Sequence, residues 1–86
     1  MPYDVTQAER LRYKRHQDAA YQVGEEAVTR LKAALALAGL TLPSLHNDGP
    51  VGCRGFVRLG GCSAALASRL AEVIAAGAQA MRDQQQ

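Results

Sequence analysis

The residues best suited to chemistry in this chain are two cysteines, Cys53 and Cys62, and two histidines, His16 and His46. Thiolates and imidazoles bind zinc, usually through at least one close C-x₂₋₄-C pair. Here six residues separate His46 from Cys53 and eight separate the two cysteines, so no such pair exists. A fourth ligand would have to be His16 or a carboxylate. We therefore predict no metal and no cofactor, and expect both cysteines to be small core residues that flank a short strand.

Cys62 has a second possible role as a nucleophile. It precedes a predicted helix, whose free amides would favour the thiolate. Catalysis also needs a base and a group that orients it, and no spacing ties either histidine to Cys62. The sequence thus predicts no catalytic residues and a protein that is not an enzyme.

A glycine pair before the same helix suggests an anion site. Gly60, Gly61 and Ser63 could cradle an anion at the helix start, assisted by Arg58. The segment matches neither G-x-x-x-x-G-K-[ST] nor G-x-G-x-x-G, and a glycine pair in this position usually forms only a turn. Anion binding is therefore a minor alternative.

A basic cluster near the N-terminus offers nucleic-acid binding as an alternative function. On a helix, its four cations spread around more than half of the circumference and form a collar. They could therefore contact a phosphate backbone. The net charge of +2 is too small to imply nucleic acid by itself, and no DNA-binding motif accompanies the cluster. A solvated helix end, with arginines paired to Glu9 and Asp18, explains it equally. The basic collar consists of Arg10, Arg12, Lys14 and Arg15.

The collar lies at the start of a long predicted helix, residues 7–38. Thr6 and Glu9 fit a capping box, and apolar residues then recur with a helical period. Gly24 keeps the phase of this stripe, which favours a close-packing site over a break. Gly39 fits a left-handed C-cap, with Leu40 folding back on Leu35. The stripe comprises Tyr13, Ala20, Val23, Gly24, Ala27, Leu31, Ala34, Leu35 and Ala38.

The second half of the chain predicts a connector, a strand and a helix. Residues 40–55 are rich in turn formers, and three leucines within them, Leu40, Leu42 and Leu45, should anchor the connector to the core. A β-prone run at 56–59 ends at the glycine pair. Ser63 can cap a helix over residues 63–81, and residues 82–86 should fray. The apolar stripe of this helix is Leu66, Leu70, Val73, Ile74, Gly77 and Met81.

These elements make one mainly α domain of 86 residues that we expect to be a homodimer. Sixteen alanines make its core thin. The long helix would extend about 46 Å, whereas a compact chain of this size has a radius of gyration of about 12 Å. Part of its stripe must face another molecule. The predicted interface is Tyr13, Ala20, Gly24, Ala27, Leu31 and Leu35.

Residues 35–74 resemble small uncharacterised proteins common in actinobacteria, which carry an A-G-[IL]-x-L-P-S-L segment and a strand ending in L-G-x-C. The matching residues are Ala38, Gly39, Leu40, Leu42 to Leu45 and Leu59 to Cys62. The resemblance implies a cytoplasmic bacterial protein and assigns no site. The lack of an apolar segment of about 18 residues and of a signal-peptide pattern also predicts a cytoplasmic protein without membrane contact. We expect a non-enzymatic, dimeric protein-interaction or regulatory accessory module; nucleic-acid binding is the alternative, and metal or anion binding a distant third.

Overall fold

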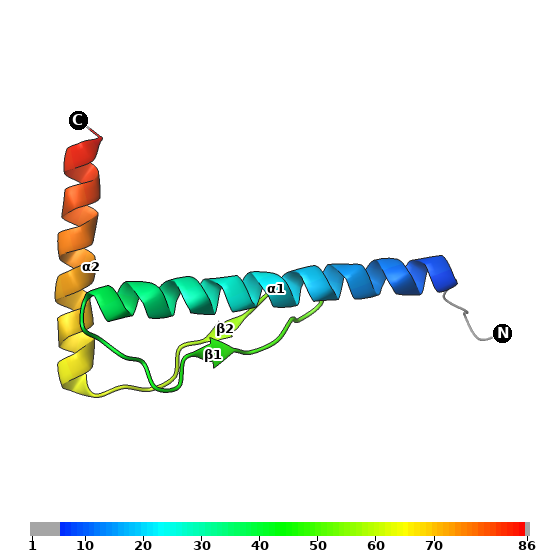
Figure 1. Ribbon diagram of the computed structural model, residues 1–86, viewed down its shortest axis with the longest axis horizontal. Coiled ribbons are helices and arrows are strands. Elements are labelled where there is room, and N and C mark those ends of the chain that lie inside the picture. The colour runs from blue at the N-terminus through cyan, green and yellow to red at the C-terminus, as the bar shows by residue number, and fades with distance from the viewer. Residues whose placement is uncertain (1–5, 86) are drawn as a thin grey trace.

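A computed structural model describes residues 6–85 and has two helices joined by a short β-hairpin (Figure 1). The elements are α1 (Gln7–Leu37), β1 (His46–Asn47), β2 (Val57–Arg58) and α2 (Ala64–Gln84). The predicted mainly α architecture is confirmed, with one addition: the strand at residues 56–59 is real but shorter, and it pairs with a second strand. The hairpin lies alongside α1, and α2 crosses the C-terminal end of α1 (Figure 1).

Both predicted ends of α1 are present. The Thr6 hydroxyl accepts a hydrogen bond from the Glu9 amide at 3.1 Å. At the other end Gly39 has a φ of +71°, and the Leu40 amide donates to the Leu35 carbonyl at 2.8 Å. The Gly39 amide donates to the Ala36 carbonyl at 3.0 Å, which completes a Schellman motif. Between these caps α1 is continuous for 31 residues, so Gly24 does not break it.

β1 and β2 form an antiparallel pair in which His46 lies opposite Arg58 and Asn47 opposite Val57. The pairing continues toward the hairpin tip, where Val51 and Arg54 exchange hydrogen bonds of 3.0 and 3.2 Å. We did not predict β1, because a two-residue polar strand has no alternating apolar pattern to reveal it. The second half of the predicted connector therefore forms one arm and the tip of a hairpin.

Two glycines let the hairpin approach α1 closely. Asn47 lies over Gly24, and a Cβ on this glycine would be 2.7 Å from the Asn47 Oδ1 atom. The Asn47 Nδ2 group donates to the Tyr21 carbonyl and to the Glu25 carboxylate, both at 3.0 Å. Further along, a Cβ on Gly55 would be 2.5 Å from the backbone oxygen of Ala20. Gly24 is thus a close-packing site, and its neighbour is the hairpin of its own chain.

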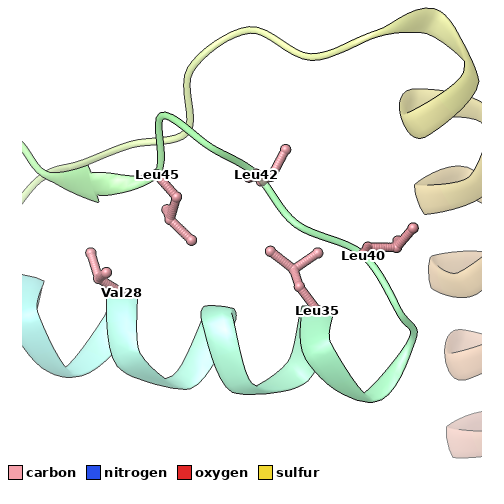
Figure 2. Packing of buried hydrophobic residues seen from close by; sticks show 5 residues of the cluster. All are labelled: Val28, Leu35, Leu40, Leu42 and Leu45. Carbon is pink, nitrogen blue, oxygen red and sulfur yellow. The ribbon is translucent and has the colours of Figure 1, made fainter.

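The core lies between the C-terminal half of α1 and the first part of the connector (Figure 2). Its buried members are Val28, Leu35, Leu40, Leu42 and Leu45. The predicted anchoring by the three connector leucines is confirmed, since their exposed fractions are 4–9%. Val28, which faces Leu45 in Figure 2, lies outside the predicted stripe. The hairpin covers one edge of that stripe, and Val23 and Ala27 on its other edge stay exposed.

α2 begins as predicted, with the Ser63 hydroxyl accepting a hydrogen bond from the Leu66 amide at 3.1 Å. It continues to Gln84, three residues beyond the predicted end at Met81. Two features extend the helix: Arg82 opposes the negative end of the helix dipole, and Gln79 donates to Asp83 one turn later at 3.2 Å.

The molecule is far from compact. Its radius of gyration is 18.5 Å and its extents are 58 × 35 × 19 Å, so α1 overruns the core as expected from its length. Over the residues that the structure describes, neither helix combines the length and hydropathy needed to span a bilayer.

Candidate functional site

Both cysteines are exposed free thiols, which corrects the prediction that they are core residues. Cys53 lies at the tip of the hairpin and Cys62 follows the glycine pair before α2. The core forms where α1 meets the connector leucines, so these two positions lie outside it. Small apolar size alone was not enough to place a cysteine inside so small a core.

The structure brings together one cysteine and one histidine. Cys53 and His16 line the same open hollow of about 480 Å³ between α1 and the hairpin tip, together with Val23 and Gly55. His46 lies on β1, where its Nδ1 atom is 2.6 Å from the Ser44 carbonyl oxygen, and Cys62 precedes α2. Within residues 6–85, no group of three or more His, Cys, Asp or Glu side chains is arranged to hold a metal ion.

The residues of the candidate anion site have other partners. The Arg58 guanidinium donates to both carboxylate oxygens of Asp48 at 3.3 Å. The Ser63 hydroxyl caps α2. Gly60 has a φ of +79° and lies against Ser44, while nothing lies within 4 Å of a Cβ placed on Gly61. The segment is therefore a strand-to-helix turn in which the Arg58 and Ser63 side chains are engaged within the chain.

The basic collar lies on the part of α1 that extends beyond the hairpin tip. All four of its side chains are exposed. The ion pairs within residues 6–85 are Arg58–Asp48 and Arg69–Glu72, so the expected pairing of collar arginines with Glu9 and Asp18 is wrong for the described part of the chain. The collar is a set of solvated cations on a projecting helix.

The predicted dimer interface on α1 divides into covered and open residues. Ala20, Gly24 and Leu35 are buried within the single chain, and Leu31 is half-buried. Tyr13, 52% exposed, and Ala27 remain open. The hairpin therefore already occupies the centre of the face that we assigned to a second copy.

An apolar hollow lies where α1, the connector and α2 meet. Its volume is about 270 Å³. Ile74 lines it and is itself 61% exposed, so the hollow opens onto the free part of α2. Sequence patterns identified the residues of both helices, but the crossing that gathers them is a tertiary feature. The lining residues are Leu31, Ala34, Leu35, Ala38, Leu40, Leu42, Leu59, Leu70, Val73 and Ile74.

Comparisons with protein-family models, with curated proteins and with solved structures give no significant match to this chain. The resemblance to small actinobacterial proteins stays a prediction, and function has to be argued from the surface of the molecule.

Proposed function

We propose that the chain is a non-enzymatic, homodimeric protein-interaction module. The observation that carries this proposal is its accessible surface of 7010 Å². A compact monomer of 9.2 kDa exposes about 4,900 Å² by the scaling of folded proteins. The excess, about 2,000 Å², is on the scale that each subunit buries in an obligate homodimer.

The character of the exposed surface supports the same proposal. Large apolar side chains are open on both helices, among them Val23 at 60%, Leu37 at 92% and Met81 at 66%. Monomeric proteins tolerate scattered apolar residues but rarely leave connected apolar surface uncovered. Association would cover part of it and leave the projecting half of α1 for a regulatory partner. The two free thiols fit the reducing cytoplasm expected from the sequence.

Sedimentation equilibrium at about 10–100 µM protein tests the proposal. We expect a dimer whose dissociation is insensitive to salt, because the exposed surface in question is apolar. A monomer across this range would overturn the homodimer.

Nucleic-acid binding is the second candidate, and the unpaired basic collar favours it. A protein that neutralises several phosphates releases counterions, so its affinity falls steeply as salt rises. A titration of short duplex DNA at several salt concentrations would support this function if a complex forms at physiological salt and shows that dependence.

A further inference from the structure

The N-terminal part of α1 projects beyond the hairpin tip (Figure 1). Residues 6–16 are all exposed, and the hollow beside the hairpin tip extends along α1 no further than His16. This segment carries the basic collar, which holds four of the ten cations of the chain. It also exposes about half of two large side chains, Leu11 at 51% and Tyr13 at 52%. Arginine and tyrosine together are typical of the surfaces that proteins use to bind one another.

The charges of the collar are placed unfavourably for a helix without a partner. Arg10 and Lys14 are four residues apart, and Arg12 and Arg15 are three apart, which are spacings at which like charges on a helix repel. Arg10 also lies in the first turn of α1, at the positive end of the helix dipole, where a cation is unfavourable. Negative charge supplied from outside the chain would relieve both effects.

The chain itself supplies too little negative charge at this end of α1. Between residues 6 and 18 the carboxylates are Glu9 and Asp18, two against four cations. In the described part of the chain, neither of them forms an ion pair with the collar. The positive potential of the segment is therefore open to solvent, and it is complementary to an acidic partner.

A shallow hollow of about 240 Å³ lies on one face of this segment. Its residues are spaced at i, i+3, i+4 and i+7, so they share a single side of the helix. The small Ala8 side chain leaves the space, Leu11 makes it partly apolar, and two arginines supply its charge. The lining residues are Ala8, Leu11, Arg12 and Arg15.

We propose that this face of α1 binds an acidic amphipathic helix of a partner protein. The inference rests on the proposed interaction function and names the chemistry of the partner. One apolar side chain of the partner helix would lie over Ala8 and against Leu11. Carboxylates on either side of it would pair with the guanidinium groups of Arg12 and Arg15, which suit bidentate binding of carboxylates. The other two collar cations would attract the partner at longer range.

The mixture of apolar and basic side chains favours a protein over a nucleic acid as the partner. A phosphate backbone supplies charge but no apolar group to cover Leu11 or Tyr13. The segment has an excess of only two positive charges, four cations against two carboxylates, so a duplex would gain little from counterion release. An acidic helix can satisfy the charge and cover the leucine in one contact.

A designed peptide tests the proposal on the full chain. The probe is a short, fluorescently labelled peptide in which leucines recur at helical spacing among glutamates. The comparison peptide has the same composition with the leucines out of helical period. Fluorescence anisotropy at about 0.15 M salt measures both. We expect a dissociation constant below about 0.1 mM for the amphipathic peptide and binding at least about fivefold weaker for the scrambled one.

Matched variants locate the contact. Reversing Arg12 and Arg15 to Glu should weaken binding of the amphipathic peptide at least about tenfold, because two attractive charge pairs become repulsive. Reversing Arg30 and Lys32, with the same change in net charge, should leave it within about threefold. Leu11→Ala keeps every charge and should weaken the amphipathic peptide about fivefold, with little effect on the scrambled one. Far-UV circular dichroism verifies that each variant is folded.

The outcomes separate this inference from the homodimer, because sedimentation equilibrium is measured on the same proteins. A dimer that binds the amphipathic peptide more weakly than about 0.1 mM would overturn the acidic partner and keep the homodimer. A monomer that binds it through Arg12 and Arg15 would do the reverse. Equal losses in the two charge variants, or no effect of Leu11→Ala, would reduce the binding to net charge and overturn the proposal. Displacement of the peptide by an equal concentration of short duplex DNA would assign the face to nucleic acid instead.

Discussion

The middle of α1 and the outer half of α2 are both apolar helical segments, yet one is covered and the other is open. From Ala20 to Leu35, the face of α1 toward the hairpin is buried by the hairpin and the connector leucines. From Ala75 to Met81, every residue of α2 is exposed and uncharged, and Ile74, 61% exposed, lies at the edge of the hollow beside α1. The first segment therefore supplies folding stability, whereas the second contributes little to the stability of the single chain.

The difference arises from a few polar and small residues, not from greater hydrophobicity. Asn47 donates hydrogen bonds to the Tyr21 carbonyl on α1 and to the Glu25 carboxylate. Gly24 and Gly55 allow the hairpin and α1 to lie in close contact. The exposed Gly77 has nothing within 4 Å of a Cβ placed on it. Glycine on a helix is thus a contact site only where another segment reaches it.

The largest predicted effect concerns the core. Leu35→Ala removes a side chain that is 5% exposed and should lower the free energy of unfolding by about 2–3 kcal/mol. Leu37→Ala, two residues away and 92% exposed, is the matched control and should change it by less than about 0.5 kcal/mol. Urea denaturation measures both. Equal effects would show that the core is not where the structure places it.

The next effect concerns the contact of the hairpin with α1. Gly55→Ala forces a Cβ against the Ala20 backbone oxygen, and neither backbone can move without separating the hairpin from the helix. The expected loss is about 1–3 kcal/mol. Gly61→Ala, with nothing within 4 Å of its Cβ and no positive φ, should have an effect below about 0.5 kcal/mol. A Gly55→Ala protein as stable as wild type would mean that the hairpin does not rest on α1.

The sequence predicted what depends on local pattern and missed what depends on the crossing of segments. Helix ends were accessible because Thr6, Gly39 and Ser63 act through neighbouring amides. β1 was missed because its pairing and its Asn47 contacts join residues 10 to 26 positions apart. For the candidate site, the apolar residues of both helices that line the hollow were visible in the sequence, but their meeting depends on where α2 crosses α1.

The effect of Gly24→Ala on stability should change sign when Asn47 is replaced. Gly24→Ala alone should destabilise the protein by about 1 kcal/mol, because the new methyl group displaces the Asn47 side chain. The loss of the Asn47 hydrogen bonds then outweighs the gain in helix propensity. In an Asn47→Ala background the same change should stabilise it by up to about 1 kcal/mol. Thermal or urea unfolding of the four proteins completes the cycle. Additive effects would indicate that Asn47 does not contact Gly24.

The exposed cysteines give a smaller effect. Replacing Cys53 and Cys62 together by serine should cost less than about 1 kcal/mol, because both side chains are at the surface and serine is nearly isosteric. Metal analysis of the wild-type protein accompanies this measurement. Stoichiometric zinc, or unfolding on addition of a chelator, would contradict the assignment of both residues as free thiols.

The smallest effect on stability is expected at the basic collar, where a second measurement decides between the two functions. Reversing Arg12 and Arg15 to Glu should change the free energy of unfolding by less than about 0.5 kcal/mol, because both are exposed and have no described acidic partner. Reversing Arg30 and Lys32, exposed on the same helix, gives a control with identical net charge. For an interaction module, dimerisation is unchanged in both variants, and wild-type protein forms no complex with short duplex DNA at physiological salt.

A nucleic-acid-binding protein would respond differently. Its wild-type complex with DNA would be lost in the collar variant but largely kept in the control variant. At low salt, where the collar variant retains weak binding, the slope of log affinity against log salt would be shallower than in wild type, since fewer phosphates are neutralised. Equal losses in both variants would assign the binding to net charge alone. We expect no wild-type complex, because the net charge is only +2 and no DNA-binding motif accompanies the collar.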